Sequence, residues 1–218
     1  MKPMFKRLFA AAAITVLAAG CAAPRKNVDY TAFKSSRPRS IVVLPPLNES
    51  PEVKATYSML SQVTYPLAES GYYVLPVALV DETFKQNGLT TPGDIHQVAP
   101  AKLREIFGAD AALYITVSKY GTSYMVINSV TAVTASAKLV DLKTGATLWS
   151  GSASATDDQG NSGGGLIGAL VAAAVKQVLN NVTEAGHKVA GVTSTRLLSA
   201  GHPGSILFGP RSPRYETD

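Results

Sequence analysis

The chain has 218 residues, and 20 Lys and Arg against 15 Asp and Glu give it a formal net charge of +5. Lys2, Lys6 and Arg7 lie in the first 20 residues, which hold no acidic residue, so residues 21–218 carry 17 basic and 15 acidic side chains and a net charge of +2. This balance argues against a nucleic-acid-binding protein. The single cysteine, Cys21, excludes a disulfide or a thiolate metal site in the rest of the chain.

Residues 1–20 have the layout of a bacterial secretory signal peptide. The basic residues precede an apolar run, Leu8–Leu17, which is too short for a membrane span of about 20 residues. Small residues follow, and "LAAGC", ending at Cys21, resembles the lipobox of bacterial lipoproteins. Ala18 stands where the usual pattern prefers Leu.

The lipobox resemblance implies that Cys21 carries a covalent diacylglycerol and an N-acyl chain after cleavage, and no other cofactor is expected. Several acyl chains give stable membrane attachment, whereas one gives only marginal binding. Ala22 follows the cysteine in place of Asp. By resemblance to the sorting rule of enteric bacteria, this predicts the outer membrane, with the domain facing the periplasm. Residues 21–39 are polar and basic with two prolines, which predicts a lipidated tether.

Residues 40–88 alternate predicted strands and helices. Residues 41–44 are apolar and β-branched and are stopped by two prolines, which predicts a buried strand. Ser50 and the proline after it are typical of a helix start, so a helix to about Glu69 is expected, kinked or divided by Pro66. A short strand at residues 72–76 and a helix at 77–88 complete this part.

The next segment is predicted to lead into a sheet. Residues 89–100 indicate a loop or a short helical turn, and residues 101–109 indicate a helix. Residues 110–121 alternate between apolar and polar side chains, which is typical of a half-buried strand. The apolar face expected for the helix consists of Leu103, Ile106 and Phe107.

The last part of the predicted domain contains strands followed by helices. Residues 123–155 indicate two or three antiparallel strands, with a turn between Asp141 and Gly145. Trp149 is expected to pack on the core or to cap the end of the sheet. A Gly-rich helix at 166–186 and a short helix at 192–199 follow, and residues 201–218 are expected to form an irregular tail.

This order predicts a single α+β domain over residues 40–200, with a mixed β-sheet and helices packed over it. The stretches "VVLPPLNES", "PLAESGYYVLPVALV", "FKQNGL", "LREIFGADAALYITVSKYG", "LVDLKTGATLWSG" and "GGGLIGALVAAAV" resemble a family of bacterial lipoproteins of unknown function, which includes a neisserial surface-antigen candidate. The family is similar in layout to the amino-terminal domain of TolB. The resemblance implies a periplasm-facing adaptor with envelope protein partners, able to form a homo-oligomer, and it implies no known reaction.

The residues give little support for catalysis. His96, His187 and His202 show no metal-ligand spacing and are interpreted as isolated surface or loop histidines. Asp157 and Asp158 are interpreted as solvated turn carboxylates. The serines have no base at recognisable spacing.

The Gly-rich segment lacks the Gly-Lys-Ser/Thr sequence of a P-loop, which argues against nucleotide binding. Gly164, Gly168 and Ala172 recur every four residues and would leave one helix face almost bare. Such a face permits close approach either of another part of the domain or of a partner.

The leading hypothesis is a non-enzymatic lipoprotein of the outer membrane that acts as an adaptor or structural component of an envelope transport, secretion or assembly complex. The alternative is a ligand-binding module that holds a lipid or a cell-wall fragment beneath the Gly-rich helix. A more remote alternative is an envelope hydrolase, which a buried Ser/His pair or a buried carboxylate pair lining a cleft would support.

Overall fold

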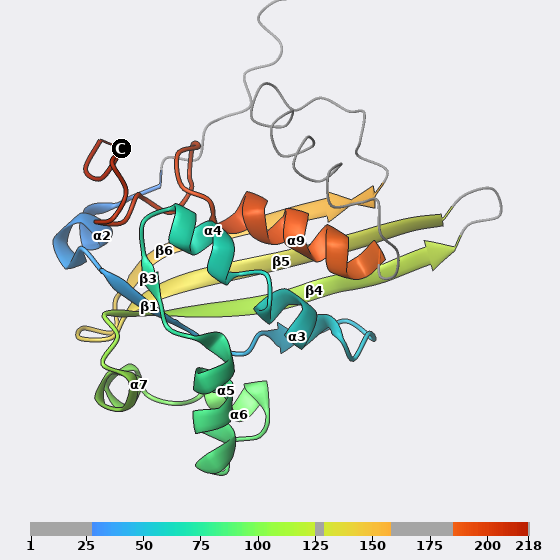
Figure 1. Ribbon diagram of the computed structural model, residues 1–218, viewed down its shortest axis with the longest axis horizontal. Helices are drawn as coiled ribbons and strands as arrows, with labels where there is room; N and C mark the ends of the chain where they lie inside the picture. The colour runs from blue at the N-terminus through green and yellow to red at the C-terminus, as the bar shows by residue number, and fades with distance from the viewer. Residues whose placement is uncertain (1–27, 125–128, 158–184, 218) are drawn as a thin grey trace, which may run out of the picture.

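A computed structural model of the chain describes residues 28–124, 129–157 and 185–217 (Figure 1). These residues form one α+β domain with a mixed sheet and helices packed on it, as predicted. The elements are α2 (Thr31–Ser36), β1 (Ser40–Val43), β2 (Leu47–Asn48), α3 (Ala55–Leu60), α4 (Thr64–Glu69), β3 (Tyr73–Val74), α5 (Val77–Gln86), α6 (Pro92–His96), α7 (Pro100–Phe107), β4 (Ala111–Tyr124), β5 (Ser129–Asp141), β6 (Thr147–Thr156) and α9 (Ala185–Leu198).

The strands form one sheet in the order β3-β1-β4-β5-β6, and β2 pairs with β4 beyond the end of β1. β1 runs parallel to β3 and β4, whereas β5 is antiparallel to both β4 and β6. The three consecutive strands β4, β5 and β6 are the meander predicted from residues 110–155. Because β6 is the last strand of this order, one of its edges has no strand partner in the sheet.

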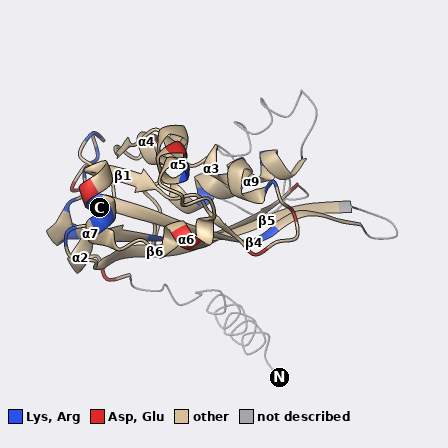
Figure 2. Cartoon of the chain, turned by 90° about the horizontal axis from the view of Figure 1, so that it is seen from below, with Lys and Arg blue, Asp and Glu red and all other residues tan. Residues whose placement is uncertain are grey.

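The two faces of the sheet carry separate apolar cores. The larger core packs β1, β4, β5 and β6 against α3, α4 and α9, which lie on one side of the sheet (Figures 1 and 2). The smaller core joins the opposite face of β1 and β4 to α5, α6 and α7. The predicted alternation in β4 is confirmed, because Leu113, Ile115 and Val117 are buried in the larger core.

The helix expected from Ser50 to Glu69 is divided, but it starts later than predicted. Ser50 is not its N-cap, since the side chain of Asn48 accepts hydrogen bonds from both the N–H and the hydroxyl of Ser50. The helix begins at Ala55, stops at Leu60 and resumes as α4. Pro66 lies in the first turn of α4, where its missing N–H costs no intrahelical hydrogen bond.

Local sequence explains the bounds of α6 and α7. The Thr91 side chain caps α6, and α7 begins at a proline and ends at Gly108 in the left-handed region. Leu103 is buried in the smaller core, whereas Ile106 is 43% exposed. Ile106 therefore lies outside the buried part of the predicted apolar face.

The predicted tether overlaps the folded domain. Residues 31–36 form α2, and the Phe33 side chain is buried in the larger core. The Tyr30 hydroxyl donates to the carbonyl of Ser205, 2.6 Å away. The predicted tether, residues 21–39, therefore includes residues that are folded into the domain. The apolar signal was missed because Tyr30 and Phe33 stand among polar and basic neighbours.

The predicted tail, residues 201–217 as described here, has no helix or strand, yet it packs firmly on the domain. Residues 205–209 are buried. The Tyr72 hydroxyl donates to the Leu207 carbonyl at 2.6 Å, and the indole N–H of Trp149 donates to the Gly204 carbonyl at 2.9 Å. We call residues 201–217 the C-terminal strap. Trp149 is buried in the larger core, which agrees with the predicted role of packing on the core.

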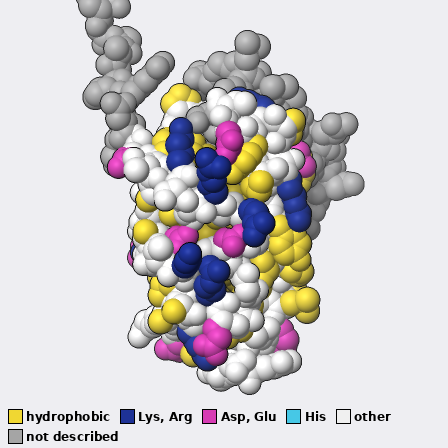
Figure 3. All heavy atoms as spheres, turned by 90° about the vertical axis from the view of Figure 1, so that its left-hand side faces the viewer, with side chains coloured by type: hydrophobic (Ala, Val, Ile, Leu, Met, Phe, Trp, Pro, Cys, Tyr) yellow, Lys and Arg dark blue, Asp and Glu magenta, His cyan; other side chains and the backbone are white. Residues whose placement is uncertain are grey.

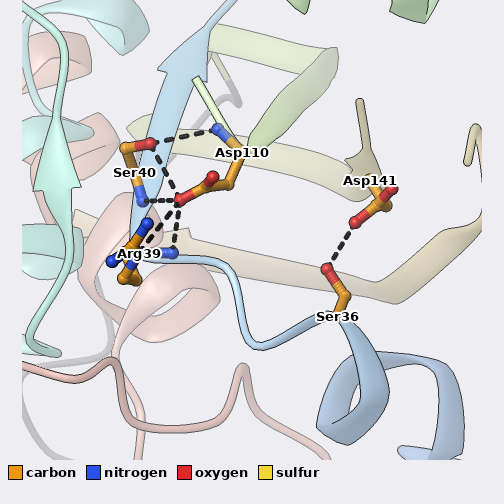
Figure 4. A network of polar contacts seen from close by, with 5 residues as sticks. All are labelled: Ser36, Arg39, Ser40, Asp110 and Asp141. Carbon is orange, nitrogen blue, oxygen red and sulfur yellow. Dashed lines mark hydrogen bonds and ion pairs between the residues drawn. The ribbon is translucent and has the colours of Figure 1, made fainter. Parts of the chain in front are cut away.

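Two carboxylates hold the end of the sheet where β4 begins and β5 ends (Figure 4). Asp110 accepts hydrogen bonds from both the N–H and the hydroxyl of Ser40 at 3.1 Å. Asp141 accepts from the Thr144 N–H at 2.6 Å and from the hydroxyl of Ser36. Asp141 thus closes the predicted β5–β6 turn and also ties α2 to the sheet.

Candidate functional site

The arrangement that most resembles a catalytic site joins α3 to α9. The Ser58 hydroxyl lies 2.9 Å from His187 Nδ1, and the other ring nitrogen lies 2.7 Å from the amide nitrogen of Gln62. The Tyr120 hydroxyl donates to Ser58 Oγ at 2.7 Å. No local sequence pattern indicates this pair, because 129 positions separate Ser58 from His187.

The hydrogen bonds do not arrange Ser58 as a nucleophile. With the Gln62 amide as placed, its nitrogen donates to His187 Nε2, so Nδ1 keeps its proton and donates to Ser58 Oγ. An activated serine needs the opposite arrangement, in which the imidazole accepts the hydroxyl proton and a carboxylate orients the ring. Among the residues that the structure describes, no carboxylate hydrogen-bonds to His187.

This polar cluster instead fixes α9 on the domain. Ser194 on α9 donates from its hydroxyl to the Gln62 carbonyl at 3.1 Å. Gly186 lies directly on the Tyr120 ring, since a Cβ there would be 2.7 Å from a ring carbon. Together with the Ser58–His187 contact, these interactions make an interhelical clasp, and stabilisation of the domain accounts for all of them.

The other histidines are half-buried rather than simply exposed. His96 lies 2.9 Å from the Pro45 carbonyl through Nε2. Burial lowers the pKa of His96, with a smaller contribution from the Lys138 charge, although the hydrogen bond to Pro45 opposes this shift. Burial also lowers the pKa of His202. No group of His, Cys, Asp and Glu among the described residues could hold a metal ion.

The remaining predicted positions have mixed outcomes. Asp157 accepts a hydrogen bond from the Thr131 N–H at 2.9 Å, so it is not simply a solvated carboxylate. Cys21 and Asp158 lie outside the described residues, as does the small-residue row of Gly164, Gly168 and Ala172.

A more informative feature is a group of exposed apolar and aromatic side chains in the segment that runs from the start of α3 to the start of α5. Six large hydrophobic side chains are exposed among the described residues, and five belong to residues 53–79, which form α3, α4, β3 and the start of α5. Their exposed fractions range from 45% to 87%. We call this group the aromatic surface; it consists of Val53, Tyr57, Tyr65, Tyr73 and Leu79.

Cations lie over two rings of the aromatic surface. Lys85 Nζ lies 5.2 Å from the centroid of the Tyr57 ring, and the Arg211 guanidinium lies 5.1 Å from that of Tyr73. Lys85 also pairs with Asp81 at 2.6 Å. These contacts limit the freedom of both rings before any partner binds. Basic and hydrophobic side chains also mix over the end of the molecule that carries α2 and the strap (Figure 3).

Sequence reasoning missed the aromatic surface. The signal available was the presence of Tyr57 and Tyr65 in a segment already predicted to be helical. Whether these tyrosine rings face the core or the solvent depends on where that helix is divided. The predicted division was at Pro66, whereas the structure divides the helix at residues 61–63.

The fold and sequence have clear relatives. The profile of the family described as "Putative lipoprotein GNA1162-like" matches residues 28–211. The Neisseria meningitidis serogroup B protein named "Putative lipoprotein NMB1124/NMB1162" is 52% identical over 211 residues, which cover 97% of each chain. The crystal structure of lipoprotein GNA1162 from Neisseria meningitidis matches with a TM-score of 0.55 and 58% identity, over 66% of this chain and all of that one.

A looser likeness is to the PelC dodecamer from Paraburkholderia phytofirmans, with 15% identity and a TM-score of 0.42 over 73% of this chain and 86% of that one. The matched range, residues 28–211, contains α2, the whole sheet and part of the C-terminal strap. The chain belongs to the family of GNA1162-like lipoproteins.

Proposed function

We propose that this chain is a non-enzymatic lipoprotein of the outer membrane, anchored through acyl chains on Cys21, that binds a partner protein of the cell envelope through the aromatic surface. Membership of a lipoprotein family supports the lipid anchor. Among the residues that the structure describes, no helix is long and apolar enough to cross a membrane. In this proposal the acyl chains supply the attachment, and the domain projects into the periplasm as part of a transport, secretion or assembly complex.

The observation that carries the adaptor function is the concentration of exposed rings in residues 53–79. Tyrosine is enriched at the centres of protein interfaces, because its ring buries a large area at a small cost in side-chain entropy. Exposed apolar surface of this kind is costly unless a partner covers it. Tyr65 and Leu79 are the best probes, since both are more than 60% exposed and contribute little to the core.

The test compares two double variants of the full-length lipidated protein in cells. Tyr65→Ser with Leu79→Ser removes two exposed apolar side chains of the aromatic surface, whereas Lys102→Ser with Glu105→Ser removes an exposed ion pair on α7. After crosslinking and purification, we expect the first variant to recover its partner at least tenfold less than wild type, with an unchanged melting temperature. The control should recover wild-type amounts. Equal recovery by both variants, or no partner for the wild type, would contradict the adaptor function.

The Ser58–His187 pair is the one observation that favours an envelope hydrolase, and a direct test separates the two functions. A fluorophosphonate probe labels serines that a base activates. Because Ser58 accepts hydrogen bonds from Tyr120 and His187, we expect no labelling of the wild-type protein. Labelling that disappears in Ser58→Ala but persists in Ser61→Ala would establish the hydrolase and refute a purely structural role for the pair.

A further inference from the structure

A groove of about 1090 Å³ extends over the face of β4, β5 and β6 that the helices of the larger core do not cover, and continues around the edge of β6. Its floor is built from two cross-strand rows of polar side chains, of which the first is made of short hydroxyl residues. One row consists of Thr116, Ser136 and Ser152, which are direct partners on β4, β5 and β6. The row beside it consists of Tyr114, Lys138 and Ser150.

The second row has an aromatic ring held in place at one end. His96 packs edge-on against Tyr114, with 5.3 Å between the ring centroids, and Lys138 Nζ lies 5.3 Å from the Tyr114 centroid on the neighbouring strand. Tyr114 is half-buried, and this burial raises the pKa of its hydroxyl, so the group stays protonated at neutral pH. The groove therefore offers an aromatic ring beside a lysine ammonium group.

The hydroxyl groups of the floor are available to a ligand. The hydroxyls of Thr116, Ser136, Ser150 and Ser152 hydrogen-bond to no other described residue. The side chains of Ser136, Ser150 and Ser152 are also exposed on the sheet. Short side chains also keep the floor shallow. A flat molecule can therefore approach the strands closely and exchange hydrogen bonds with several hydroxyls at once.

The charge of the groove differs from the near-neutral net charge of the domain. The described residues that line it include the cations Lys138 and Arg196, together with two histidines whose pKa values are lowered by burial, but no Asp or Glu. Cations in a cleft without carboxylates attract an anionic ligand. The β6 edge is partly occupied, since Arg196 donates to the Ser154 carbonyl at 2.9 Å. This contact disfavours a peptide that would add a strand to β6.

We propose that this groove binds an acidic oligosaccharide. The Tyr114 ring packs against the face of one sugar, the Thr116–Ser136–Ser152 row exchanges hydrogen bonds with sugar hydroxyls, and Lys138 pairs with a carboxylate on the glycan. A volume near 1000 Å³ suits a ligand of several rings. None of the residues that line the groove belongs to the aromatic surface, so the proposal does not depend on the adaptor function.

The carboxylate could come from the lactyl group of a muramic acid unit or from a uronic acid, and three probes distinguish these sources. Calorimetric titration of the full-length lipidated protein in detergent would use a GlcNAc–MurNAc tetrasaccharide, a galacturonate tetrasaccharide and neutral chitotetraose. We expect saturable binding of at least one acidic probe, at least tenfold tighter than that of chitotetraose. The acidic probe that binds more tightly identifies the source. Equal binding of the neutral sugar, or no binding of either acidic probe, would overturn the proposal.

Variants then test the location of the site. Lys138→Gln should weaken binding of the acidic probe at least tenfold, and Ser136→Val with Ser152→Val should weaken it further. Lys143→Gln removes an exposed lysine in the β5–β6 turn, outside the groove, and should bind as wild type. Because Lys138 and Ser136 are exposed, their variants should keep the wild-type melting temperature. Wild-type affinity in both groove variants would place the sugar elsewhere and contradict the assignment.

Discussion

At the scale of single residues, Gly71 shows how closely the C-terminal strap packs. Gly71 has a φ of +96°, and a Cβ there would lie 2.5 Å from the backbone nitrogen of Ser212 and 2.7 Å from the Gly209 carbonyl oxygen. The chain reinforces this crossing with a hydrogen bond from Gly209 N–H to the Ser70 carbonyl at 2.8 Å. Backbone therefore packs on backbone, which only glycine allows at both positions.

Gly71→Ala should be strongly destabilising, and Gly88 provides the matched control. Gly88 has a similar φ of +82°, but no atom lies within 4 Å of its hypothetical Cβ. Gly88→Ala should therefore cost only the left-handed strain, about 1–2 kcal/mol. Gly71→Ala adds a clash with rigid backbone, so we expect about 3 kcal/mol or more in urea unfolding. Equal losses of unfolding free energy in the two variants would mean that the strap does not press on Gly71.

Asp141 should contribute to stability in a pH-dependent way. Burial alone raises its pKa, but hydrogen bonds from Ser36, Thr144 and Lys143 outweigh burial, and the net pKa is lowered. The folded state thus holds fewer protons than the unfolded state just below the ordinary value of 3.8. The stabilisation is complete above that value and is lost as the pH falls through the lowered pKa.

The corresponding variant is Asp141→Asn. We expect a loss of about 1–3 kcal/mol at pH 7, because hydrogen bonds to a charged acceptor are replaced by weaker ones. The difference from wild type should shrink between pH 4 and the lowest pH at which both proteins fold. Chemical unfolding measured at several pH values checks this, and a difference that stays constant down to pH 3 would contradict the lowered pKa.

At the scale of elements, the C-terminal strap is a structural part of the domain. Aromatic donors from three separate segments hold its carbonyl groups: Tyr30 binds Ser205, Trp149 binds Gly204 and Tyr72 binds Leu207. The strap thereby connects the segment before α2, the edge strand β6 and the segment before β3. An irregular chain is stable here because side chains satisfy the backbone groups that a helix or strand would pair.

Tyr72→Phe measures how firmly the strap is held. The variant keeps the ring but leaves the buried Leu207 carbonyl without its donor, which should cost about 1–3 kcal/mol. Tyr73→Phe is the control, because that ring is 45% exposed and should change stability by less than about 0.5 kcal/mol. Thermal unfolding of both proteins checks the pair. A neutral Tyr72→Phe variant would show that water replaces the hydroxyl and that the strap is loosely held.

The regular elements were the predictable part of the structure. Alternation in residues 110–121 identified β4, and Gly145, with a φ of +74°, marked the turn after β5. These signals are local, so a single sequence carries them. The predicted helix start at Ser50 was wrong, because the Ser50 hydroxyl donates to the Asn48 side chain and the helix begins only at Ala55.

The strap and the candidate sites could not be predicted in this way. The burial of residues 205–209 depends on contacts with Tyr72 and Trp149, which are distant in sequence. The contact between Ser58 and His187 also joins residues that are far apart in the chain. The groove rows arise from the register of β4, β5 and β6, which no periodicity specifies. Exposed tyrosines and exposed serines acquire meaning only after the faces of the sheet are known.

At the scale of the whole molecule, different parts of the domain have different proposed tasks. The aromatic surface on α3, α4, β3 and α5 is proposed to contact a partner protein, and the groove beneath β4–β6 is proposed to bind glycan. The lipids on Cys21 are proposed to hold both near the outer membrane. The interhelical clasp attaches α9 to the domain, and the strap is hydrogen-bonded to the segment before β3 and to β6.

The central claim is that the aromatic surface contacts a partner protein in the envelope. The most direct measurement places a photo-crosslinking amino acid at residue 65, at residue 79 and, as a control, at residue 105 on α7, and irradiates cells that express the full-length lipoprotein. We predict that positions 65 and 79 give the same discrete crosslinked protein and that position 105 gives none. Crosslinks of equal yield at all three positions, or none at 65 and 79, would contradict the account.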